Sequence, residues 1–142
     1  FEIRALAGYG FKFNDKQLSN GKLRPFSGQY HFVNLETAYR LRTGGDSDEV
    51  KIDFTSGFRF SENILLLGQT FSTIAIDSNK TNTNGENNID RYTNFKAQFS
   101  GVVQTSKTTS VQLGTYTGVY SEVNENSFKT YQGFMISLWK GF

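Results

Sequence analysis

The chain of 142 residues contains no cysteine, one histidine and one proline. Without cysteine there is neither a disulfide framework nor a thiolate metal site, and one histidine cannot build a histidine-based zinc centre by itself. We therefore expect no metal and no cofactor. The 15 Lys and Arg nearly balance the 13 Asp and Glu, which leaves a net charge of +2. A concentrated basic stripe, the mark of a nucleic-acid-binding protein, is not present, so no nucleic-acid partner is predicted.

Long apolar runs are also lacking. The longest, residues 64–67, has four residues, whereas a membrane-spanning helix needs about 18 or more. Five Ala and ten Leu stand against 14 Thr, 14 Gly and 21 Phe plus Tyr. Because β-branched and aromatic side chains favour strands and straight-chain residues favour helices, this composition predicts an all-β chain. The length predicts a single domain over residues 1–142.

The mean hydropathy of −0.46 is low for a chain in which 15% of the residues are aromatic. A soluble β-sandwich gathers its aromatic side chains in one core. A barrel in lipid instead alternates apolar outward residues with polar inward residues, so its average hydropathy resembles that of a soluble protein. The period of the sequence pattern distinguishes these two arrangements.

Residues 50–60 alternate strictly, with Ile52 and Phe54 on one face and Lys51 and Asp53 on the other. A period of two is the side-chain repeat of a strand, and six further segments show it. The predicted strands have roughly 10 to 15 residues, enough for a tilted membrane strand of about 9 to 11 and longer than the 5 or 6 of globular strands. They cover residues 1–13, 30–42, 50–60, 64–76, 92–104, 111–121 and 128–142.

The connections between these strands alternate in length. Residues 61–63 and 105–110 are short turns, whereas residues 43–49 and the Asn-rich residues 77–88 are longer or more polar. Short turns on one side and long loops on the other are typical of outer-membrane barrels. Residues 14–29 are an exception, because they place a long polar connection on the short-turn side. A protein partner is expected to contact the external loops, residues 43–49 and 77–88.

Ten charged residues share the polar faces of the predicted strands, seven of them basic and three acidic. In a narrow barrel they would pair across strands, because an unpaired buried charge costs several kcal/mol. Two interpretations stay open: a salt-bridge network that plugs a small lumen, and a weakly basic pore that passes small anionic or polar solutes. The ten residues are Glu2, Arg4, Lys12, Glu36, Arg40, Arg42, Lys51, Asp53, Arg59 and Lys96.

Two other groups carry chemistry of their own. One hypothesis for His31 is a barrel-borne lipid-modifying enzyme, in which Asp77, Ser78 or Glu36 would be its catalytic partner. No Gly-x-Ser-x-Gly elbow accompanies this histidine. A solvated or interfacial histidine is therefore predicted, and no catalysis is expected. Residues 46–49 form an acidic run whose oxygens suit calcium or magnesium. Its spacing lacks the Gly and terminal Glu of a helix-loop-helix calcium site, which favours a solvated turn.

Aromatic residues stand near the ends of the predicted strands. Amphipathic rings favour the depth of lipid headgroups, so aromatic girdles mark both interfaces of a membrane barrel. The alternative origin of these rings is an ordinary β-protein core. The strand-end aromatics are Phe1, Phe13, Tyr30, Phe60, Tyr92, Phe128, Trp139 and Phe142.

The last nine residues, FMISLWKGF, resemble the terminal strand of Gram-negative outer-membrane β-barrels. That strand ends on an aromatic residue, usually Phe, and carries apolar residues at alternate positions before it. The chain departs from the pattern at Lys140, where the family usually has an aromatic or apolar residue. The matching residues are Phe134, Ile136, Leu138 and Phe142.

This resemblance implies an antiparallel up-and-down transmembrane β-barrel in the bacterial outer membrane, in contact with lipid and lipopolysaccharide. It also implies that the barrel assembly machinery reads the last strand. The expected role is passive: structural, surface interaction, or a small-solute pore. Four stretches, residues 34–41, 50–60, 65–72 and 138–142, also resemble an uncharacterised set of proteobacterial outer-membrane barrel proteins, which has no assigned activity.

The strand count leaves the size of the barrel open. Single-chain bacterial barrels have an even number of strands, and seven are predicted here. Either residues 18–28 hold an eighth strand, or the chain is the C-terminal part of a longer barrel.

A soluble calycin-type barrel that binds a lipid or another apolar ligand is the alternative of similar length. The two hypotheses invert the faces of the sheet. A carrier buries Phe54, Phe58, Phe95 and Phe99 in its lumen, whereas a membrane barrel turns them toward lipid.

Overall fold

A computed structural model describes residues 1–13, 26, 28–42, 47–76, 92–122 and 127–140, without the side chains of residues 122 and 127. All regular structure in these ranges is β. The strands are β1 (Glu2–Lys12), β2 (Tyr30–Arg40), β3 (Asp48–Ser61), β4 (Ile64–Ile76), β5 (Tyr92–Ser106), β6 (Thr109–Glu122) and β7 (Ser127–Lys140). None of the described residues belongs to a helix with the length and hydropathy of a membrane span.

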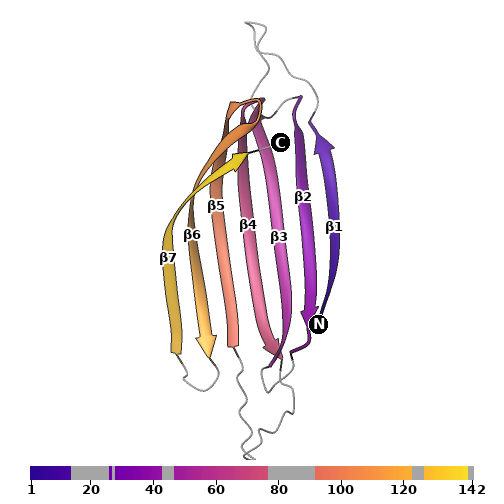
Figure 1. Cartoon of the computed structure of the whole chain (residues 1–142), viewed down its shortest axis with the longest axis vertical. Helices are drawn as coiled ribbons and strands as arrows, with labels where there is room; N and C mark the ends of the chain where they lie inside the picture. Colours follow the sequence, from indigo (N-terminus) through magenta and orange to yellow (C-terminus); the bar gives the residue numbers. More distant parts are fainter. Residues whose placement is uncertain (14–25, 27, 43–46, 77–91, 123–126, 141–142) are drawn as a thin grey trace, which may run out of the picture.

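The seven strands form one sheet in chain order, and each strand is antiparallel to the next (Figure 1). The all-β, up-and-down architecture predicted from the sequence is therefore confirmed. β1 and β7 are the edges of the sheet and run in the same direction. No ladder joins these two edges within the described ranges, so the sheet is an open one. Most of residues 18–28, the candidate eighth strand, lies outside the described residues.

The strand boundaries follow the predicted ones closely, and β4 has the predicted limits. The largest difference is at the predicted turn of residues 105–110, where β5 continues to Ser106 and β6 begins at Thr109. Only Lys107 and Thr108 remain between the strands, and the Thr108 N–H donates to Ser106 Oγ at 3.3 Å. Two-residue hairpin turns match the twist of the flanking strands, and Thr suits a ladder position, so the strands extend further than hydropathy alone indicates.

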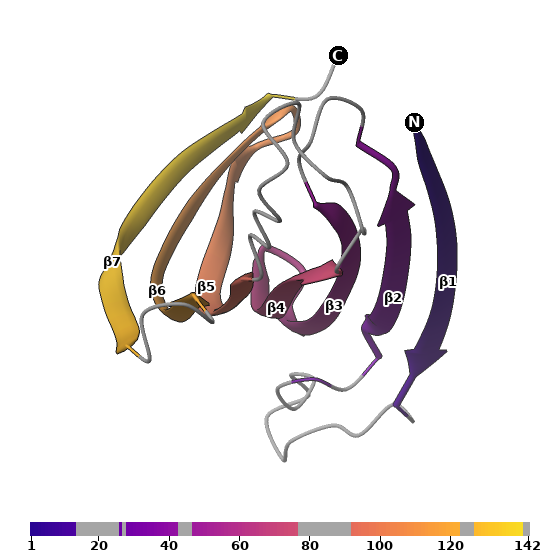
Figure 2. The same ribbon diagram turned by 90° about the horizontal axis from the view of Figure 1, so that it is seen from below.

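The sheet curves into an open arc with β1 and β7 at its two ends (Figure 2). On one face, side chains from strands two apart meet. The Tyr92 hydroxyl of β5 donates to Glu49 of β3, and the Tyr131 hydroxyl of β7 donates to Asn94 of β5 at 2.8 Å. Strands two apart are separated by about 9–10 Å, so these contacts require curvature toward the face that carries them. We call it the concave face and its opposite the convex face.

Two glycines allow aromatic rings to lie flat against the concave face. Gly118 pairs with Tyr131, and a Cβ at Gly118 would lie 2.2 Å from the tyrosine ring. Gly57 pairs with Phe32 in the same way, again at 2.2 Å. A ring that covers a glycine across a strand pair is a recognised means of bending a sheet. The curvature thus coincides with two cross-strand pairs of a glycine and an aromatic residue.

Every strand contributes exposed apolar side chains to the convex face, interspersed with Ser and Thr. Its side chains include Phe99, which is 62% exposed, and Phe134, which is 87% exposed. The buried apolar side chains of the described residues are few, and the ladder registers place all of them on the concave face. They are Ala38, Leu67, Ala75 and Val102. The apolar side chains of the convex face therefore do not form a core within the sheet.

Candidate functional site

Nine of the ten predicted inward charges lie on the concave face. The ladder registers put them in phase with one another and with Asn94. Arg42 follows the end of β2, and its guanidinium reaches a carboxylate of the same face, Glu49. The nine residues are Glu2, Arg4, Lys12, Glu36, Arg40, Lys51, Asp53, Arg59 and Lys96.

Glu49 is the most buried charged side chain of this face, with 2% of its surface exposed. Arg42 Nη2 donates to it at 2.6 Å, Arg40 Nη1 at 3.4 Å, and the Tyr92 hydroxyl makes a third, short hydrogen bond. The prediction of a solvated turn at residues 46–49 is therefore wrong for Ser47, Asp48 and Glu49, all of which are buried. Burial is tolerated because two cations and a hydroxyl replace water around the carboxylate.

Asp48 is held on the other side of β3. It accepts the Arg42 backbone N–H at 3.0 Å and the Tyr39 hydroxyl at 3.2 Å. The contact of residues 43–49 with a protein partner stays a prediction. Residues 43–46 and 77–88 lie outside the described residues. In the parts of the chain that the structure describes, no group of three or more His, Cys, Asp or Glu is arranged to hold a metal ion.

A chain of ion pairs runs from Glu49 to the edge of the sheet. Arg40 Nε donates to Glu2 at 2.6 Å, Glu2 also contacts Arg4, and Arg4 Nη1 donates to Glu36 at 2.9 Å. Charges alternate in sign along this chain. Its outer end is solvent-exposed, with 60% of the Arg4 side chain accessible, and exposed pairs contribute little to stability. The ion pairs of Glu49 with Arg40 and Arg42 form the inner end, and they are the strongest of the chain because Glu49 is buried.

The remaining inward cations stand apart from this chain. Lys12 lies over the Tyr30 ring at 6.0 Å, and Arg59 donates to the backbone carbonyl of Glu62 at 3.4 Å. Lys51 and Asp53 share the concave face of β3 two residues apart. Lys96 lies between two aromatic rings, those of Phe71 and Tyr116.

Uncharged polar side chains occupy the concave face of β4, β5 and β6. Gln98 Nε2 donates to Gln69 Oε1 at 3.0 Å, and Gln112 Nε2 donates to Ser100 Oγ at 2.7 Å. These side chains satisfy one another across neighbouring strands, so the middle of the sheet presents amide and hydroxyl groups rather than ion pairs. The periodicity of the sequence placed these positions on the polar face without revealing which pairs form.

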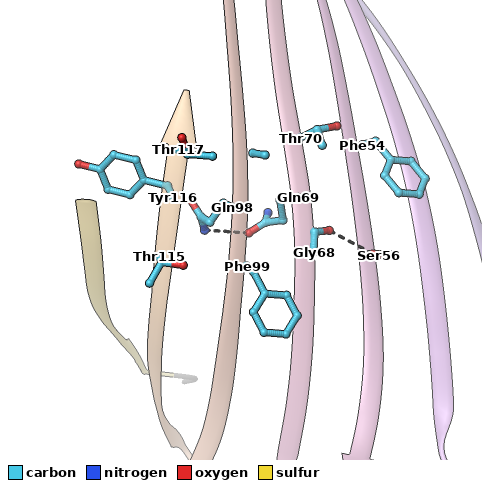
Figure 3. A pocket seen from close by; sticks show the side chains of 11 residues that line it. Phe54, Ser56, Gly68, Gln69, Thr70, Gln98, Phe99, Thr115, Tyr116 and Thr117 are labelled. Atoms are coloured by element: carbon cyan, nitrogen blue, oxygen red, sulfur yellow. Dashed lines mark hydrogen bonds between the residues drawn. The ribbon is translucent and has the colours of Figure 1, made fainter. Parts of the chain in front are cut away.

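A shallow hollow of about 380 Å³ lies over the central strands (Figure 3). Phe54 and Phe99 line it from the convex face, whereas the hydrogen bond between Gln98 and Gln69 lies on the concave face of the same strands. A second hollow, of about 510 Å³, shares Phe99 and is lined mainly by phenylalanines of the convex face. Among the described residues, the lining of neither hollow includes an Asp, Glu, Lys, Arg or His side chain.

His31 lies on the convex face and is 1% exposed, so the prediction of a solvated histidine is wrong, whereas an interfacial histidine stays a prediction. The ring is packed against Phe13 at 4.7 Å, Phe11 at 5.4 Å and Phe58 at 5.7 Å, measured between centroids. Nε2 lies 2.9 Å from the carbonyl oxygen of Phe26. Because a carbonyl only accepts, Nε2 carries the proton, and the buried Nδ1 has no partner among the described residues.

The structure does not bring His31 together with a catalytic partner in the described ranges. Glu36 lies on the opposite face of β2 and is bound to Arg4. Asp77 and Ser78 lie outside the described residues. His31 is buried because Phe26, at a positive φ of 65°, folds over it and donates its N–H to the Phe60 carbonyl at 3.2 Å.

Three residues of the terminal-strand signature lie on the convex face of the edge strand β7. Phe134 is 87% exposed, Ile136 is 79% exposed and Leu138 is 70% exposed. Phe142 lies outside the described residues. Tyr92 is one of the strand-end aromatics, and its ring lies on the concave face, where its hydroxyl donates to Glu49. This position differs from that of a ring in an interfacial girdle, which faces lipid.

Comparison of the chain with protein-family models, with curated proteins and with solved structures finds no match. What the protein does is therefore argued from the distribution of its side chains over the two faces of the sheet.

Proposed function

We propose that this chain forms the wall of a β-barrel in the bacterial outer membrane. Its convex face contacts lipid and lipopolysaccharide, and its concave face lines a water-filled passage for small polar solutes. The role is passive, with no catalysis. The observation that carries this proposal is the inverted distribution of side chains, with exposed apolar residues on the convex face and charges on the concave face.

The convex face supports the lipid contact. Soluble monomers rarely expose large contiguous apolar patches, whereas all seven strands contribute exposed apolar side chains to this face. The strands have 11 to 15 residues, and a tilted strand needs about 9 to 11 to cross the hydrocarbon region. The strand lengths and the apolar side chains of the convex face therefore both support a sheet that crosses a membrane. The outer-membrane location and recognition by the barrel assembly machinery rest on the resemblance of Phe134, Ile136 and Leu138 to the terminal-strand signature.

The concave face supports the aqueous passage. The charged chain around Glu49 and the amides of the central strands both need water or polar partners. A soluble carrier of an apolar ligand would need the reverse arrangement, with Phe54, Phe58 and Phe99 inside. These rings lie on the convex face.

A lysine substitution on the convex face tests the lipid contact. Phe99 stands at the middle of β5, and Val103 of the same face stands near its end. If lipid covers this face, Phe99→Lys lowers the free energy of unfolding in lipid vesicles by about 2–4 kcal/mol, and Val103→Lys by about 0–1 kcal/mol. On a water-exposed face, both substitutions stay within about 0.5 kcal/mol. Urea unfolding followed by the fluorescence of Trp139, the single tryptophan, measures the difference.

Two results would contradict the proposal. A protein that is monodisperse without detergent, and whose stability Phe99→Lys leaves unchanged, has its convex face in water and is not the wall of a membrane barrel. A protein that inserts into planar bilayers without conductance steps has no open passage, and its role is then structural or a surface contact.

A further inference from the structure

Lys96 differs from the three arginines of the ion-pair chain around Glu49. Arg4, Arg40 and Arg42 each contact a carboxylate. Lys96 Nζ instead lies 5.2 Å from the centroid of the Phe71 ring and 5.0 Å from that of Tyr116. Within the described ranges, no carboxylate lies at ion-pair distance from it. Aromatic rings attract a cation through their quadrupole and leave its net charge in place.

The ladder registers explain why none of the acidic residues on the described strands pairs with Lys96. Phe71 pairs with Lys96 on one side and with Asp53 on the other, so its strand separates the two charged positions by about 9–10 Å. Glu122 is the only acidic residue in the sequences of β4 to β7. It pairs with Tyr92, which precedes Lys96 by about 13 Å along β5.

A hydrogen-bond donor stands beside this cation. Asn94 precedes Lys96 by two residues and shares its face. Asn94 Oδ1 accepts the Tyr131 hydroxyl at 2.8 Å, so its Nδ2 group remains a donor toward the concave side. A lysine point charge next to an amide donor suits the oxygens of a small anion.

We propose that Lys96 and Asn94 bind a small oxyanion on the concave face, and that Phe71 and Tyr116 hold the ammonium group in place for it. This inference rests on the proposed function, because it requires the concave face to be in water. It names the solute class that the passage prefers, and it makes Lys96 the residue that sets this preference.

The test uses inorganic phosphate as the probe. The isotopically labelled full chain in lipid nanodiscs is titrated with phosphate, and the backbone amide resonances of residues 94–98 are followed by NMR. Saturable shifts are expected for the unmodified protein and for Lys96→Arg, which keeps the charge. They are lost in Lys96→Gln. Lys107→Gln removes the same charge at the exposed β5–β6 turn and is expected to retain them. Chloride at equal ionic strength controls for screening.

Equal phosphate shifts in Lys96→Gln and the unmodified protein would overturn the inference. If Lys96→Gln loses its folded spectrum, Lys96→Met replaces it, because its side chain still packs between the two rings; the same criterion applies. Reversal potentials across planar bilayers give a second readout, in which Lys96→Gln is expected to shift the preference toward cations. Saturable phosphate binding without conductance supports this site and overturns the passage. Conductance with an unchanged ion preference and no phosphate shifts overturns this site and leaves the passage.

Discussion

Glu49 and His31 are both almost completely buried, at 2% and 1% exposure, at opposite ends and on opposite faces of the same sheet. Glu49 has three donors around its carboxylate: Arg40, Arg42 and Tyr92. His31 has one hydrogen bond, to Phe26, and four phenylalanine rings within 6.3 Å between centroids. The concave face thus buries a carboxyl group by surrounding it with partners, whereas the convex face buries an imidazole ring by covering it with apolar groups.

The largest expected effect follows the removal of the Glu49 carboxylate. Glu49→Ala leaves the guanidinium groups of Arg40 and Arg42 close together without their shared anion. Breaking a buried ion pair on one side costs about 3–5 kcal/mol, and because both arginines are about one-third exposed, the lower part of that range is expected. Urea unfolding in lipid vesicles measures the loss. Glu62→Ala, at the exposed β3–β4 turn, serves as the control and should change stability by no more than about 0.5 kcal/mol. Equal effects of the two substitutions would show that Glu49 is not a structural anchor.

A smaller effect is expected for Tyr92→Phe, which keeps the ring and removes only the hydroxyl donor to Glu49. A hydrogen bond to a charged group contributes about 1.5–3 kcal/mol, and the two arginines that remain keep the loss near the lower end. Tyr30→Phe removes a hydroxyl from a tyrosine that is 72% exposed, and it should leave the unfolding midpoint unchanged. If both variants unfold at the same denaturant concentration, the hydroxyl of Tyr92 adds nothing to the network.

The smallest effect is expected for His31→Phe. The substitution removes one hydrogen bond, worth about 0.5–1.5 kcal/mol, and also an unpartnered buried nitrogen, whose burial costs about 1–3 kcal/mol. These contributions oppose each other. The free energy of unfolding should therefore fall by no more than about 1 kcal/mol relative to the unmodified protein, and it can increase. A loss as large as that of Glu49→Ala would show that His31 holds the Phe26 segment in place, and that the two buried polar residues are equivalent.

The strands and their faces could be predicted because a period of two is a local property of the sequence. Ile52, Phe54, Lys51 and Asp53 reveal their faces without reference to any other segment. The alternation of residues 50–60, extended two residues toward the N-terminus, places Glu49 on the same polar face as Lys51. Glu49 also belongs to the acidic run at residues 46–49, and that run by itself predicts a turn.

Burial of Glu49 and His31 could not be predicted, because it depends on segments that are distant in the sequence. Tyr92 reaches Glu49 from β5, across β4, only because the sheet is curved. His31 is covered by Phe26, whose backbone adopts a left-handed conformation that a non-glycine residue rarely takes. The curvature itself depends on matched pairs such as Gly118 and Tyr131, which become partners only in the correct register.

The direction of the two edge strands limits how the sheet is completed. In hydrocarbon, each backbone amide or carbonyl without a partner costs several kcal/mol, so a membrane sheet cannot leave the outer rows of β1 and β7 bare. Every antiparallel neighbour reverses the direction of the chain, and β1 and β7 point the same way. An all-antiparallel ring therefore needs an odd number of strands between these edges, whichever polypeptide supplies them, whereas a direct junction of β1 with β7 would be parallel.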